Sequence, residues 1–157
     1  MRPARWMLAA LVAVLVIAHF VLRVGYGLGG IVPNLLVLAV LLAAREMRPG
    51  SAAGLGLLLG LLEGAAVAAT LGASAVVLVV LGYLGARSRE WLESETFLAL
   101  ALYLFVGKWL YDALLFLVLE MKFDAPPISN LLLVSPLAAL YTALVGAVVM
   151  IAYRSIA

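Results

Sequence analysis

The chain is a succession of long apolar stretches, and its ionisable residues lie mostly in the breaks between them. Only 11% of the 157 residues are charged and 68% are hydrophobic, whereas soluble globular domains carry about 25% charged residues. A soluble fold of this composition would expose large apolar patches to water. The sequence therefore predicts an all-α membrane protein, with a single domain spanning residues 1–157.

The breaks divide the chain into six expected transmembrane helices. A span requires about 20 apolar residues, within a range of roughly 17–25. Residues 51–86 would make one helix of about 54 Å, which exceeds a hydrocarbon core of about 30 Å. We therefore expect two helices there, with a break between Thr70 and Ser74. The six expected helices are 6–22, 31–44, 52–69, 73–86, 96–119 and 129–153.

The ends of two of these helices carry further signals. The first apolar run has no clear small-residue cleavage site after a short core, so we expect a retained helix rather than a signal peptide. Pro33 and Asn34 are expected to shape the entrance to the second helix, because proline is tolerated in a first helical turn. Pro136 is expected to bend the sixth helix.

The basic residues outside the spans predict the orientation, because cytoplasmic loops hold an excess of Lys and Arg. With both termini in the cytoplasm, six helices place most of the arginines on that side: Arg2, Arg5, Arg45, Arg48, Arg87, Arg89 and Arg154. Only Arg23 and Lys122 then face outward. A single span over 51–86 would move Arg87 and Arg89 outside, so the charge distribution favours six spans.

Three ionisable residues lie well inside the expected spans: Glu63, Lys108 and Asp112. Each costs about 2.5–3.5 kcal/mol at a helix centre on insertion scales. Lys108 and Asp112 are four residues apart and can pair on one helix face. Glu63 has no basic residue in reach on its own helix, so it is either protonated or meets Lys108 across the bundle. We expect a Glu63–Lys108–Asp112 cluster, which would either lock the helix packing or form a partner-binding or ion-relay site.

His19 is the only histidine and lies one turn before Arg23. A lone histidine cannot build a metal site, and cysteine is absent, so we expect no metal and no cofactor. The position of His19 near the outer end of the first helix predicts a place at the membrane interface.

Gly56, Gly60 and Gly64 recur every four residues on the third expected helix. Small residues at this spacing let helix backbones approach closely. The pattern predicts tight packing, within the chain or against a partner, with the former favoured. The glycines between positions 25 and 30 follow no strand, so we interpret them as a turn rather than a nucleotide-binding loop.

Several functional classes are disfavoured. The few serines and threonines have no histidine in reach except His19, and no acidic pair typical of a metal enzyme occurs. A net charge of +2 gives no indication of nucleic-acid binding. We therefore expect a protein that is not an enzyme and acts within the bilayer or at its faces.

Two apolar stretches of the chain carry a further signal. The first is Pro33-Asn34-Leu35-Leu36-Val37-Leu38, and the second runs from Gly54 to Glu63 as GLGLLLGLLE. Both resemble the rod shape-determining protein MreD family. The continuation Leu71-Gly72-Ala73 and the ending Leu81-Gly82-Tyr83-Leu84-Gly85-Ala86-Arg87 agree as well. The resemblance covers about the first 95 residues, and Glu63 stands where family members often have an aspartate.

This resemblance implies a non-enzymatic scaffold of the rod complex, or elongasome, in the bacterial cytoplasmic (inner) membrane. Such a protein binds the transmembrane helix and adjoining segment of MreC, and supports cell shape and lateral peptidoglycan synthesis with other members of the complex. The family is also similar in fold to the S-components of energy-coupling-factor transporters. The alternative function is therefore an S-component-like subunit that binds a small molecule such as a vitamin, and Ala9 and Ala13 provide a small-residue pair of the kind used for docking there.

Overall fold

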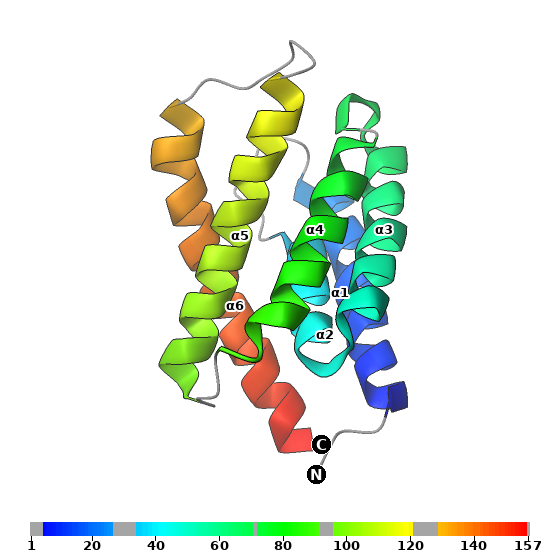
Figure 1. The fold of residues 1–157 in the computed structure, drawn as a ribbon, viewed down its shortest axis with the longest axis vertical. Coiled ribbons are helices and arrows are strands. Elements are labelled where there is room, and N and C mark those ends of the chain that lie inside the picture. The colour runs from blue at the N-terminus through cyan, green and yellow to red at the C-terminus, as the bar shows by residue number, and fades with distance from the viewer. Residues whose placement is uncertain (1–4, 27–33, 71, 92–95, 121–128, 157) are drawn as a thin grey trace.

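The computed structural model describes residues 5–26, 34–70, 72–91, 96–120 and 129–156. These residues form six α-helices and no β-strand, which confirms the predicted all-α class. The helices are α1 (Arg5–Tyr26), α2 (Leu35–Glu46), α3 (Pro49–Ala66), α4 (Ala73–Ser88), α5 (Phe97–Glu120) and α6 (Ser135–Ile156). They run roughly along one axis and alternate in direction (Figure 1).

Four of the described helices are long and apolar enough to cross a membrane, which indicates a multi-pass membrane protein. They are Arg5–Gly25, Pro49–Ala66, Phe97–Leu119 and Leu132–Ile156. The apolar helix α4 has 16 residues. With 12 residues, α2 is about 18 Å long, well short of a hydrocarbon core of about 30 Å. That all six helices span the bilayer therefore stays a prediction.

Helix α2 is the centre of the bundle. Ten successive residues, from Leu35 to Ala44, are buried, so every side of the helix is covered by protein. It contacts each of the other five helices. The side chain of Asn34 caps its first turn by accepting a hydrogen bond from the Val37 backbone N–H at 3.2 Å, which agrees with the predicted role at this entrance. Pro33 lies outside the described residues.

Helices α3 and α4 form a hairpin, with the break where the length argument places it. A short 3₁₀ turn, Ala68–Thr70, follows α3. Gly72 has a φ of +81°, a left-handed conformation that glycine adopts without a steric cost. The hydroxyl of Ser74 then donates to the Gly60 carbonyl at 2.9 Å, which ties the start of α4 to α3.

The glycines of α3 bring its backbone against α4. A Cβ added to Gly56 would collide with the Leu78 carbonyl, and one added to Gly60 would collide with the Ala75 Cα. Gly82 of α4 faces the Ala52 carbonyl of α3 in the same way. Gly64 is buried too. The close contact predicted from the small-residue spacing is thus made within the chain.

The start of α6 departs from regular helix geometry. A π-helical turn, Asn130–Val134, precedes it, and Pro136 follows immediately. Proline cannot donate the backbone hydrogen bond of a continuous α-helix, and a wider turn before it relieves the resulting conflict. The chain is therefore irregular just before Pro136, and the bend expected at this residue stays a prediction.

One end of the bundle gathers the arginine-bearing helix ends. The start of α1 and the end of α6 lie there, together with the α2–α3 connection and the last turn of α4 (Figure 1). These segments carry Arg5, Arg45, Arg48, Arg87, Arg89 and Arg154. Arg23, near the last residue of α1, lies toward the opposite end. The arrangement matches the charge asymmetry from which the orientation is predicted.

Candidate functional site

Glu63 is bound by two side chains of α1. Its carboxylate accepts a hydrogen bond from Arg23 Nη1 at 2.7 Å, and His19 Nε2 lies 3.1 Å from its other oxygen. Glu63 is only 8% exposed and His19 only 6%. The result is a buried charged cluster between α1 and α3, which we call the outer cluster (His19, Arg23 and Glu63).

The expected meeting of Glu63 with Lys108 is wrong, because Glu63 pairs with His19 and Arg23, and Lys108 pairs with Asp112. Glu63 lies three residues before the end of α3, and Arg23 lies three residues before the end of α1. These two helices run in the same direction, so both residues reach the same level (Figure 1). Lys108 lies near the middle of α5, and its ammonium group pairs with Asp112 of the same helix.

His19 is buried within the bundle, and its Nδ1 has no hydrogen-bond partner among the described residues. That it lies at the level of the membrane interface stays a prediction. His19 and Arg23 are four residues apart, so both lie on one face of α1. This spacing could have predicted that one acidic residue on another helix contacts both.

Lys108 and Asp112 do form the predicted pair. The ammonium group of Lys108 contacts both oxygens of the Asp112 carboxylate. The hydroxyl of Ser135, in the first turn of α6, donates to the same carboxylate. We call this group the inner cluster (Lys108, Asp112 and Ser135). Ser135 was not among the predicted site residues, because a serine in an apolar segment gives no sign of which helix it will face.

The outer cluster connects α1 with α3, and the inner cluster connects the successive helices α5 and α6. Every charge in them has an opposite charge or a hydrogen-bond donor within reach, as a desolvated charge requires. Such a cluster fixes the rotation and depth of one helix against another. Its members are engaged with each other, which favours the packing interpretation over an ion relay.

The outer cluster carries a testable expectation. Replacing Arg23 with Gln should lower the free energy of unfolding by about 1–3 kcal/mol, because a buried carboxylate loses a charged donor. The control is Arg5→Gln, at the exposed start of the same helix. Thermal unfolding of both variants in one detergent measures the difference. Equal midpoints would show that Arg23 contributes no more than a surface arginine.

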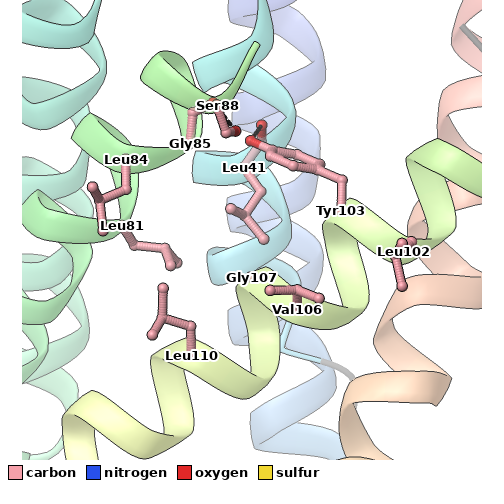
Figure 2. A pocket seen from close by; sticks show the side chains of 10 residues that line it. All are labelled: Leu41, Leu81, Leu84, Gly85, Ser88, Leu102, Tyr103, Val106, Gly107 and Leu110. Atoms are coloured by element: carbon pink, nitrogen blue, oxygen red, sulfur yellow. Dashed lines mark hydrogen bonds between the residues drawn. The ribbon is translucent and has the colours of Figure 1, made fainter. Parts of the chain in front are cut away.

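An apolar groove lies between α4 and α5, with α2 at its base. It encloses about 230 Å³. Its lining residues are Leu41, Leu81, Leu84, Gly85, Ser88, Leu102, Tyr103, Val106, Gly107 and Leu110. The Tyr103 hydroxyl donates to the Leu41 carbonyl at 2.8 Å, and the Ser88 hydroxyl donates to the Gly85 carbonyl at 2.9 Å (Figure 2). The sequence did not predict this groove, because it depends on how far two helices diverge.

The described residues contain no group of three His, Asp or Glu side chains that could hold a metal ion. The site therefore consists of two polar clusters inside the bundle and one apolar groove on its side. No family model, no curated protein and no solved structure matches this chain.

Proposed function

We propose that this protein is a non-enzymatic membrane scaffold of the MreD type, which binds MreC within the rod complex of a bacterial cytoplasmic membrane. The observation that supports this proposal is that the charged side chains within the spans bind one another in the outer and inner clusters. They stabilise a fixed arrangement of helices and leave no charged group of these clusters directed at a substrate. The sequence resemblance supplies the identity of the partner.

The outer surface of the bundle suits a partner that is itself a transmembrane helix. Exposed apolar side chains cover one side of each of three helices: Val14, Ile17, Val21 and Val24 on α1, Leu57, Leu58, Leu61 and Leu62 on α3, and Leu137, Leu140, Leu144, Val148 and Ile151 on α6. In a bilayer such faces contact either lipid or the side of another helix. Gly56 and Gly60 are already covered by α4, so we assign MreC contact to these outer faces.

In this proposal both termini lie in the cytoplasm, because the arginine-rich end of the bundle carries them both. MreC and other rod-complex members would then be held at fixed positions relative to the bundle. The scaffold acts by holding its partners in place. Because its surface is already rigid, binding does not lose conformational entropy by ordering that surface.

The test is site-specific photo-crosslinking in native membranes. A photoreactive amino acid is placed at Val14, Leu58 or Val148, one on each outer face, and crosslinked products are identified by mass spectrometry. We expect MreC to crosslink to one face and not to the others. A tagged, unmodified chain should recover MreC at near-stoichiometric amounts in mild detergent.

Other products would contradict the proposal. Recovery of a transporter's ATPase and coupling subunits without MreC would establish the S-component alternative, and so would a small molecule retained through purification. The described groove does not favour that alternative, since ligand pockets usually enclose about 300–1,000 Å³ and place several convergent polar groups around the ligand.

A further inference from the structure

We propose that the groove between α4 and α5 is a binding site for one anionic phospholipid, with an acyl chain in the groove and the phosphate group on Arg45 and Arg87. This site is separate from the scaffold function, and neither depends on the other. The proposal rests on three observations: the direction of polarity along the groove, the arginines at its polar end, and its size.

Polarity changes from one end of the groove to the other. The hydroxyl groups of Ser88 and Tyr103 lie together at one end, whereas Leu81 and Leu110 lie further along (Figure 2). The polar end lies where α4 ends and near the start of α5, so it faces the end of the bundle that holds the start of α1 and the end of α6. A lipid has the same order, with a polar group at the membrane surface and a hydrocarbon chain beneath it.

Arg45 contacts a residue of this polar end, and Arg87 and Arg89 are next to Ser88 in the chain. The guanidinium of Arg45 lies over the ring of Tyr103, 5.5 Å from its centroid. Arg89 donates to the Arg45 carbonyl at 2.9 Å, which brings the end of α4 against the end of α2. Arg87 is one residue from Ser88, is 59% exposed at its side chain, and is only loosely paired with Glu90 at 3.9 Å.

The charge near the groove is positive overall. Residues 45–48 and 87–90 contain four arginines and two glutamates. Basic pockets between transmembrane helices on the cytoplasmic side bind anionic lipid headgroups, and each Lys or Arg near the surface strengthens the attraction. Charge complementarity therefore selects a phosphate-bearing lipid without a compensating positive group.

Size favours a lipid chain over a partner helix. The groove encloses about 230 Å³, less than the pockets that hold a drug-sized ligand. A helix is about 10–12 Å across with its side chains, so it would have to rest on the rim rather than fill the groove. A single hydrocarbon chain is narrow enough to lie between the leucines of α4 and α5.

Native mass spectrometry of the purified, delipidated protein tests the site. Phosphatidylglycerol and phosphatidylcholine with the same acyl chains are titrated in parallel. We expect the wild-type chain to bind one phosphatidylglycerol in preference to phosphatidylcholine. The double variant Arg45→Gln/Arg87→Gln should lose affinity for phosphatidylglycerol by about twentyfold to thirtyfold.

Two further variants locate the lipid. Leu84→Trp fills the groove and should reduce binding of the lipid, whereas Leu58→Trp on α3 makes the same change outside the groove and should not. Arg154→Gln removes an arginine at the same end of the bundle and is the control for overall charge. Circular dichroism and elution profiles establish that each variant is folded.

The proposal would be overturned by equal binding of the two lipids, or by wild-type affinity in the double arginine variant. Loss of affinity in the arginine variant with full binding in Leu84→Trp would place the lipid on the arginines alone and exclude the groove. Equal losses in Arg154→Gln and the double variant would show a general effect of charge rather than a site.

Discussion

Replacing Lys108 with Met is expected to lower the free energy of unfolding by about 3 kcal/mol or more. Lys108 is 6% exposed, and its ammonium group is the cation that neutralises Asp112. Without it, Asp112 keeps only the Ser135 hydroxyl, and an uncompensated buried charge typically costs about 3–5 kcal/mol. Equilibrium unfolding in mixed detergent micelles measures the loss.

Two comparisons show whether the stranded charge is the cause. The double variant Lys108→Met/Asp112→Leu removes both charges and should recover most of the stability, because an apolar pair can replace a buried ion pair at little cost. Arg89→Gln removes an exposed hydrogen bond to the Arg45 carbonyl and should cost about 1 kcal/mol or less. If the double variant is as unstable as Lys108→Met, loss of packing rather than charge is responsible.

The second large effect is expected for Gly60→Ala. The new Cβ would collide with the Ala75 Cα and approach the Ser74 carbonyl, both backbone atoms that cannot rotate away. Overpacking of this kind costs about 1–3 kcal/mol. It also forces α3 away from α4 where Ser74 bonds to the Gly60 carbonyl. Both the unfolding midpoint and the yield of monodisperse protein should fall.

Gly54→Ala is the matched control, because it lies on the same helix and a Cβ there meets nothing within 4 Å. Alanine has a helix propensity about 1 kcal/mol better than glycine, so this variant should be neutral or slightly more stable. The two substitutions are chemically identical and should change stability in opposite directions. Equal stability of both variants would contradict the close approach of α3 and α4.

The sequence predicted the helices because apolar length and charged breaks are local properties. The hairpin in residues 51–86 followed from comparing the length of the segment with the thickness of a bilayer, and the pair Lys108–Asp112 followed from helical spacing. These inferences need no knowledge of which helices become neighbours. The MreD-like scaffold function and the identity of its partner stay proposals.

Contacts between helices were harder to predict. Glu63 was assigned to Lys108 by charge balance, although its partners are His19 and Arg23. Counting residues from the helix ends would have suggested Arg23 as a partner of Glu63, since each lies three residues before the end of its helix. Nothing local, however, indicated that Ser135 faces Asp112, because the rotation of α6 is set by packing along its whole length.

The complete burial of α2 has a consequence for how the protein is made. This helix leaves the ribosome before α4, α5 and α6, which cover much of it. Until those helices are made, the sides of α2 are exposed to lipid or to insertion factors. In a chain stalled on the ribosome after α3, α2 would therefore be accessible. A cysteine placed at Leu38 would react with a membrane-permeant thiol reagent in the stalled chain but not in the finished protein.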